Sequence, residues 1–151
     1  MDDTDRALVQ ALMERGRAPY AELGRLVGLS GPSVQDRVRR LEERGVITGF
    51  HAVVDPAKVG LGVSALVGVY SSDGVETDDV ARRLRDVSEI EDCWYVAGEE
   101  EFVLKVRAAD VAALEHVVSK VRRLRGVSRT RTTVILSTRW EHRAGPLPQS
   151  D

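Results

Sequence analysis

The sequence has a single cysteine, few aromatic residues and no long apolar run. A chain whose one cysteine is Cys93 cannot form an internal disulfide bond. No apolar stretch approaches the roughly 18 residues that a membrane-spanning helix needs. The first residues, Met1–Asp5, are acidic, whereas a signal peptide begins with a basic segment. We therefore expect a cytoplasmic protein that has no membrane partner.

The chain also lacks a large excess of charge of either sign. Its 22 Lys and Arg face 24 Asp and Glu, a net charge of −2, so overall charge does not indicate a nucleic-acid-binding protein. Arginines nevertheless cluster between positions 37 and 44, and a local cationic face binds phosphates even on a neutral domain. The histidines, at 51, 116 and 142, are too scattered for a metal site, and we expect neither a metal nor a cofactor.

Apolar residues recur at helical spacing through about the first 45 positions, which predicts three helices. The first covers about residues 4–14, and the second begins near Pro19, a residue suited to a first helical turn. Gly28 fits the left-handed position that ends a helix, and Ser30 is a good N-cap for the third. The expected apolar stripe of the second helix is Leu23, Leu26 and Val27. That of the third is Val34, Val38 and Leu41.

The spacing changes near Gly49, which divides the chain. We expect a helix-turn-helix domain in residues 1–49 and a linker strand in residues 50–62, where β-forming residues are frequent. A second domain should occupy residues 63–137, and the proline-containing residues 138–151 should form a loose tail.

The second domain is predicted to alternate as strand, helix, strand, strand, helix, strand. We expect strands at 63–71, 90–96, 101–107 and 127–137, with helices at 77–87 and between Asp110 and Gly126. This order is that of the ferredoxin-like βαββαβ fold, so the fold class is α+β.

Both helices of such a fold cover one face of the sheet, and the other face should then be polar if it meets water. Residues 65–70 and 133–136 instead carry apolar or β-branched side chains at successive positions. We expect a second copy of the chain to cover this face, which makes a homodimer. The alternative is that the linker or the tail covers it.

A helix-turn-helix requires a small residue where two helices cross, a glycine-containing turn, and a second helix with an apolar inner and a polar outer face. Residues 23–44 meet these requirements. Ser33 and Gln35 are placed to read base edges, and the N–H groups near Ser30 to face a phosphate. Residues suited to phosphates, or one of them to a guanine, are Arg37, Arg39, Arg40 and Arg44. We expect Asp36 to pair with an arginine. The alternative is an ordinary solvated helix face.

Several segments resemble the leucine-responsive/asparagine-operon regulator (Lrp/AsnC) family. The resemblance extends over about residues 2–140 and is carried by regularly spaced motifs. These are residues 2–6, 16–17, 26–30, 37–42, 45–50, 96–106 and 130–132. It implies a winged helix-turn-helix, a long linker strand, and a ferredoxin-like domain that dimerises and binds amino acids or related metabolites. It also implies that dimers assemble into octamers or other higher oligomers, and that the protein binds double-stranded DNA.

The resemblance places an amino-acid effector near the hairpin at 97–101 and the start of the last strand. The turn of Ala97, Gly98 and Glu99 can present backbone N–H groups to a carboxylate. Glu99 or Glu101 would then accept from the ammonium group, and Thr130 and Thr132 would add hydroxyls. This chain has Glu at positions 99–101 where Asp is common in the family, which alters the expected pocket depth. The alternative is a solvated turn.

Other residues have more than one interpretation. Trp94 and Tyr95 indicate core or interface packing, and Cys93 indicates a small buried hydrophobe in preference to a redox-sensing thiol. A second basic cluster either contacts acids of an adjacent dimer or is solvated: Arg122, Arg123, Arg125, Arg129 and Arg131.

Two other functions are alternatives to a DNA-binding regulator. Some tetrapyrrole decarboxylases resemble the same two-domain fold, but this chain has no residues arranged for acid–base or nucleophilic chemistry, so we expect no enzyme and no catalytic residues. A ligand-binding module with a vestigial DNA domain is disfavoured by the intact arginine-rich helix.

Overall fold

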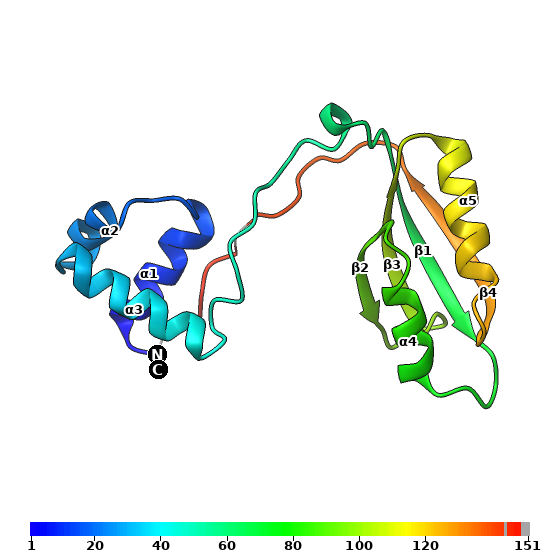
Figure 1. Ribbon diagram of the computed structural model, residues 1–151, viewed down its shortest axis with the longest axis horizontal. Helices are drawn as coiled ribbons and strands as arrows, with labels where there is room; N and C mark the ends of the chain where they lie inside the picture. The colour runs from blue at the N-terminus through cyan, green and yellow to red at the C-terminus, as the bar shows by residue number, and fades with distance from the viewer. Residues whose placement is uncertain (144, 149–151) are drawn as a thin grey trace. The chain divides into compact units, whose positions relative to one another are not determined.

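The computed structural model describes residues 1–143 and 145–148, and it divides into two compact units (Figure 1). The first unit combines Met1–Val53 with the described residues from Trp140 onwards. The second spans Val54–Arg139. In the described part of the chain, no helix is both long and apolar enough to span a membrane.

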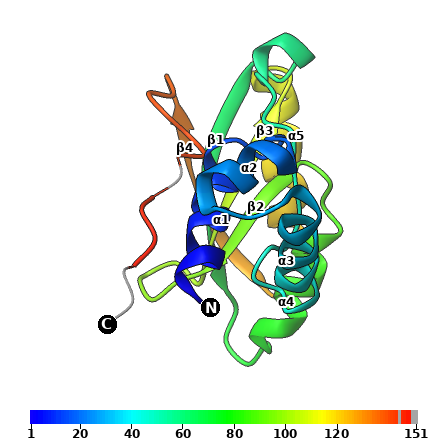
Figure 2. The ribbon, with the colours of Figure 1, turned by 90° about the vertical axis from the view of Figure 1, so that its left-hand side faces the viewer.

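The first unit contains the three predicted helices (Figures 1 and 2). They are α1 (Asp3–Glu14), α2 (Tyr20–Val27) and α3 (Gly31–Glu43). Side-chain capping explains where α1 and α3 begin. The Asp2 carboxylate accepts from the Asp5 N–H over 2.7 Å, and the Ser30 hydroxyl accepts from the Ser33 N–H over 3.3 Å. The predicted Ser30 N-cap is confirmed.

The core of this unit is an apolar cluster drawn from all three helices. Its buried members are Leu8, Leu12, Leu23, Val34 and Val38. Leu41 is buried as well, so the predicted stripe of α3 is confirmed. The prediction for Leu26 was wrong, because its side chain is 63% exposed. Helix α2 buries Leu23 and Gly24 instead, which turns its inner face away from Leu26.

Two glycines fit the chain into the turn between α2 and α3. Gly28 ends α2 with a φ of 71°, the left-handed conformation predicted for it. A Cβ added to Gly24 would lie 2.3 Å from the carbonyl oxygen of Leu29. The two backbones approach so closely that only glycine fits, which is the small residue that a helix crossing of this type requires.

The predicted wing and the linker strand of residues 50–62 were wrong for the single chain. No strand follows α3 in the described residues before β1, and Ala57–Val59 forms a short 3₁₀ helix, η1. A strand needs a neighbour for its N–H and C=O groups, and β-forming residues alone do not supply one. The side chains of Val53 and Val54 are exposed accordingly.

The second unit has the predicted ferredoxin-like order. Its strands are β1 (Val63–Ser71), β2 (Ile90–Tyr95), β3 (Phe102–Ala108) and β4 (Val127–Ile135). Its helices are α4 (Thr77–Arg85) and α5 (Val111–Arg122). The sheet order is β2-β3-β1-β4, and each neighbouring pair is antiparallel. The βαββαβ prediction is therefore confirmed.

Helices α4 and α5 cover one face of this sheet and share a core with it, formed by residues such as Val67, Leu84, Leu104 and Val121. The opposite face, which we call the open face, is more mixed than expected. It presents Leu66 but also the buried cations Lys105 and Arg107, both of which pair with Glu91. The open face thus joins apolar and charged side chains.

The tail was expected to be loose, and its described part forms two hydrogen bonds with α1. The Leu147 N–H donates to Gln10 Oε1 over 3.1 Å, and Arg6 Nη1 donates to the carbonyl of Pro148 over 2.9 Å. Gln10 and Arg6 lie one turn apart on α1, so this segment follows the surface of that helix. Residues 144 and 149–151 of the predicted tail lie outside the described residues.

Candidate nucleic-acid interface and ligand site

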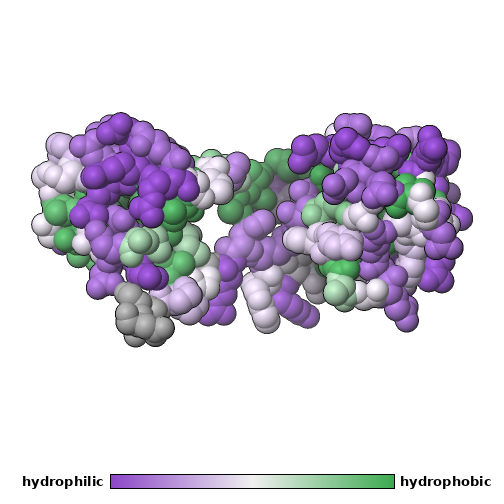
Figure 3. Space-filling view, turned by 90° about the horizontal axis from the view of Figure 1, so that it is seen from below, coloured by the Kyte–Doolittle hydropathy of each residue, from purple (hydrophilic) through white to green (hydrophobic). Residues whose placement is uncertain are grey.

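Helix α3 has one buried face and one exposed face. Its inner face is closed by the buried Val34, Val38 and Leu41. The predicted DNA-contacting residues that remain exposed are Ser30, Ser33, Gln35, Arg39, Arg40 and Arg44. Hydrophilic residues cover much of the surface in Figure 3, so polarity alone does not locate an interface. The distinguishing feature is a helix whose exposed face carries several guanidinium groups and an amide.

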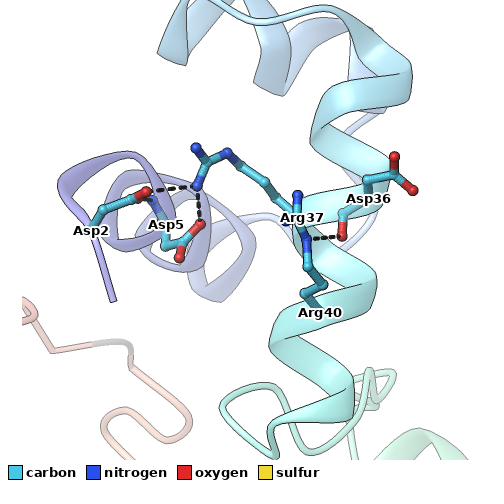
Figure 4. Close-up of polar contacts among 5 residues, drawn as sticks. All are labelled: Asp2, Asp5, Asp36, Arg37 and Arg40. Carbon is cyan, nitrogen blue, oxygen red and sulfur yellow. Dashed lines mark hydrogen bonds and ion pairs between the residues drawn. The ribbon is translucent and has the colours of Figure 1, made fainter.

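Arg37 differs from the expectation that it faces outward. Its Nη1 lies 2.8 Å from a carboxylate oxygen of Asp2 and 2.8 Å from one of Asp5, so the side chain points to the start of α1 (Figure 4). Its side chain is 29% exposed and that of Asp5 is 11% exposed. Arg37 therefore joins α3 to α1 in the free protein and is not held ready for a phosphate.

The electrostatics of this contact follow from its hydrogen bonds. The backbone N–H of Asp5 and the Arg37 guanidinium lower the pKa of the Asp2 carboxyl below its usual value. Hydrogen bonds to Asp2 and then to Asp5 raise the pKa of Arg37. The charged forms of both partners are thus favoured.

The other arginines of α3 have different neighbours. Arg39 pairs with Asp36 at 3.2 Å and with Glu43 at 3.4 Å, as expected for Asp36. Arg40 Nε donates to the backbone carbonyl of Asp36 over 3.2 Å (Figure 4). A polar groove of about 500 Å³ separates the second half of α3 from the start of α1. Its lining residues include Arg37, Arg40 and Arg44.

At the start of α3 the hydroxyls have structural partners. Ser30 Oγ and Ser33 Oγ lie 2.8 Å apart, in addition to the capping bond from the Ser33 N–H. The two hydroxyls therefore fix the first turn, where backbone N–H groups have no partner within the helix. Such a helix start attracts a phosphate oxygen.

In the second unit, the predicted effector residues of the hairpin lie at the connection between β2 and β3. Ala97, Gly98 and Glu99 are exposed, and the connection is closed by a 3.0 Å hydrogen bond from the Val96 N–H to the Glu101 carbonyl. The Glu101 N–H donates to the Val69 carbonyl over 2.9 Å, which ties the hairpin to β1.

The three glutamates of this hairpin differ in their surroundings. The Glu101 carboxylate accepts from the Thr77 hydroxyl at the start of α4. Glu100 forms an ion pair with Arg131 of β4, and its side chain is only 13% exposed. Glu99 is exposed, so it is the glutamate most open to an approaching ligand.

Glu100 is a residue that sequence reasoning missed. Its side chain lies over Gly68, where an added Cβ would come within 2.6 Å of Glu100 Cγ. Gly68 and Arg131 are direct partners in the β1–β4 register. The contact could have been predicted only from the pairing register of β1 and β4, which is not evident from the sequence.

Thr130 and Thr132 share one face of β4, as predicted, but not the face of Arg131. They pair with Val69 and Val67, whose side chains enter the core on the helix side. The structure therefore brings Glu100 to the open face with Arg131 and places both threonines on the other face. Within a single chain, Glu100 and the two predicted threonines therefore lie on opposite faces of the sheet.

The last residues of β2 are less buried than expected. Cys93, Trp94 and Tyr95 are exposed, so the expected burial of Cys93 was wrong. As a strand at the sheet edge, β2 has a neighbour on one side only. Partial burial still raises the pKa of the Cys93 thiol, which disfavours the reactive thiolate.

In the part of the chain that the structure describes, no group of three or more His, Cys, Asp or Glu is placed to hold a metal ion.

These two units define a class of protein. A three-helix domain with a glycine turn and an arginine-bearing outer helix, joined to a ferredoxin-like unit, is the composition of a two-domain DNA-binding regulator. Residues 1–42 match the AsnC-type helix-turn-helix domain and residues 64–145 match the Lrp/AsnC ligand binding domain. The chain belongs to the Lrp/AsnC family of transcriptional regulators.

Individual relatives agree over almost the whole length. The chain is 46% identical over 143 residues to the HTH-type transcriptional regulator LrpA of Mycobacterium tuberculosis, covering 95% of each chain. It is similar to a solved feast or famine regulatory protein from M. tuberculosis complexed with L-methionine, with 45% identity, a TM-score of 0.90 and coverage of 96% and 98%. Escherichia coli AsnC has 27% identity, a TM-score of 0.83 and coverage of 93% and 95%.

Family membership decides between a regulator and an enzyme. The chain is a transcriptional regulator with a helix-turn-helix and a ligand-binding domain, and the prediction that it is not an enzyme is confirmed by its relatives.

Proposed function

We propose that this chain binds operator DNA with the outer face of α3. The observation that carries the proposal is the pairing of a locked inner face, Val34 and Val38, with an outer face on which Gln35, Arg39 and Arg40 are exposed. A helix of this kind fits the major groove, where side chains near its N-terminus reach base edges and basic residues reach phosphates. The contact extends along the DNA backbone through Ser30, Ser33 and Arg44. We assign this activity to a cytoplasmic regulator.

The effector of this proposal is an amino acid bound at the β2–β3 hairpin. Two solved relatives, from M. tuberculosis and Neisseria meningitidis, are described as complexes with L-methionine. In this chain the exposed turn of Ala97, Gly98 and Glu99 supplies backbone N–H groups and a free carboxylate. Since Glu101 and Glu100 already have partners within the chain, Glu99 is the acceptor we assign to the ligand's ammonium group.

Assembly completes the proposed site. Thr130 and Thr132 lie on the helix side of the sheet, and we assign their hydroxyls to the ligand pocket of a second copy of the chain. We assign the open face, with its half-exposed Leu66, to a homodimer contact and expect dimers to form higher oligomers such as octamers. Effector binding would change this assembly and thereby which operator half-sites are bridged.

The experiment is a fluorescence-anisotropy titration of the DNA upstream of the protein's own gene, with and without each amino acid. A pseudo-palindromic site should bind with nanomolar affinity and strong salt dependence. The double substitution Arg39→Ala with Arg40→Ala removes two positive charges and should weaken binding to every sequence, whereas Gln35→Ala leaves the charge unchanged and should alter site preference alone. Arg82→Ala with Arg83→Ala on α4 removes equal charge and is the control. Unchanged DNA affinity in both α3 variants contradicts the assignment.

A further inference from the structure

An acidic residue occupies the middle of the proposed DNA-facing surface. Asp36 lies two residues from both Val34 and Val38, which are buried on the inner face. At about 100° of rotation per residue, Asp36 therefore points away from the core. Its side chain is 63% exposed. A carboxylate at this place is repelled by phosphates, so it reduces affinity for DNA of every sequence.

Asp36 holds a neighbouring guanidinium in a defined position. Arg39 Nη2 lies 3.2 Å from Asp36 Oδ1, and Arg39 Nη1 lies 3.4 Å from Glu43 Oε1. The three residues follow one another at spacings of three and four on the same helix face. Arg39 thus extends along the surface of α3 between two carboxylates, and its charge is locally compensated.

The chemistry of this pair matches one kind of base pair. In the major groove guanine presents the acceptors O6 and N7, which a guanidinium contacts with two hydrogen bonds, and its partner cytosine presents the N4 donor, which a carboxylate accepts. An Asp–Arg pair in contact on one helix face offers both complements side by side. An A·T pair presents a methyl group and an adenine amine in place of this pattern.

We propose that Asp36 and Arg39 together read one G·C base pair of the operator. Arg39 contacts guanine, while Asp36 accepts from the cytosine amine and fixes the direction of the guanidinium. Asp36 is thereby a specificity-determining residue whose cost in general DNA affinity is offset only at sites with the matching base pair. This assignment rests on the proposed function, since it requires α3 to enter the major groove.

The experiment selects binding sites from a random DNA library with the full-length protein and with three variants. They are Asp36→Ala, Asp36→Asn and Glu43→Gln. The last is the matched control, because it neutralises the other carboxylate beside Arg39 but lies nearly two turns nearer the end of the helix. Selected sites are then titrated with every base pair at each position, alongside a DNA of unrelated sequence.

Wild type should prefer G·C at one position of each half-site. Asp36→Ala should lower this preference by about 5- to 100-fold and bind the unrelated DNA more tightly, while Glu43→Gln should keep the preference. Asp36→Asn should bind the unrelated DNA as tightly as Asp36→Ala, because it removes the same charge, but it should lose less of the preference because its amide oxygen still accepts a hydrogen bond. Identical base preferences in wild type and Asp36→Ala overturn the inference. A wild type that selects no sequence contradicts the proposed function itself.

Discussion

Arg37 of α3 donates to a carboxylate oxygen of Asp5 on α1 over 2.8 Å, and this contact fixes the two helices against each other. The same Nη1 atom also donates to Asp2, whose carboxylate caps the start of α1. One guanidinium thus joins the beginning of the first helix to the middle of the third. Helix α3 is the helix assigned to DNA. Its orientation therefore depends on Arg37, a residue that does not face outward.

Arg37→Ala should reduce the stability of the first unit, because it leaves the mostly buried Asp5 carboxylate without its partner. We expect a smaller loss than that of Leu8→Ala, a core truncation that costs about 2–5 kcal/mol. Urea unfolding followed by circular dichroism measures both. Arg37→Lys is the control, which keeps the charge. Equal stability of Arg37→Ala and wild type would show that the contact does not hold the helices.

The pH dependence of this contact follows from the lowered pKa of Asp2. Since the folded-state pKa lies below the unfolded value, the ionised carboxylate contributes stability above the ordinary carboxyl pKa of about 4. That contribution is lost as the pH falls through the lower folded-state value. The stability difference between wild type and Asp2→Asn, which retains a capping side chain, should be constant near neutrality and vanish in acid. A difference that persists in strong acid contradicts this explanation.

The two glycines of the turn should respond differently to substitution. Gly24→Ala places a methyl group 2.3 Å from the Leu29 carbonyl oxygen and should cost about 1–3 kcal/mol. Gly28→Asn should be tolerated better than Gly28→Ala, because asparagine accepts the left-handed conformation more readily. Thermal unfolding of the three variants tests this order. A Gly24→Ala protein as stable as wild type would mean that α2 and α3 separate easily.

Removing the end of the tail, from residue 144 onwards, should weaken the first unit slightly. A chain that ends at Arg143 loses the hydrogen bonds from Arg6 to Pro148 and from Leu147 to Gln10. At the usual value for partly exposed hydrogen bonds, the loss is about 1 kcal/mol each or less. Hydrogen exchange of α1 amides reports it directly, with α5 amides as the reference. Unchanged exchange throughout α1 would show that the tail only touches the helix.

Local signals account for what could be predicted from the sequence. The bounds of α3 and its Ser30 cap depend on residues within one or two turns, and β1 was predicted at residues 63–71, where it is found. The misplaced features depend on partners far along the chain. Arg37 turns to α1 because of Asp5, 32 residues away. Residues 50–56 form no strand because, in the described part of the chain, no other strand pairs with them.

The ligand site illustrates the same limit. The exposed turn at Gly98 could be predicted from its composition, whereas the partner of Glu100 could not. That contact requires Gly68 and Arg131 to be opposite each other in the sheet, a relationship set by the register of β1 and β4. Spacing along the chain placed Thr130 and Thr132 on one face but did not indicate that Glu100 lies on the other.

The most direct measurement for the account as a whole is photocrosslinking of the protein to its selected operator DNA. Benzoylphenylalanine would replace Gln35 on the outer face of α3, or Arg82 on α4, which is also exposed to solvent. We predict an ultraviolet-dependent protein–DNA adduct at position 35 that unlabelled operator suppresses, and none at position 82. An adduct at position 82 with none at position 35 would contradict the claim that α3 carries the DNA-binding surface.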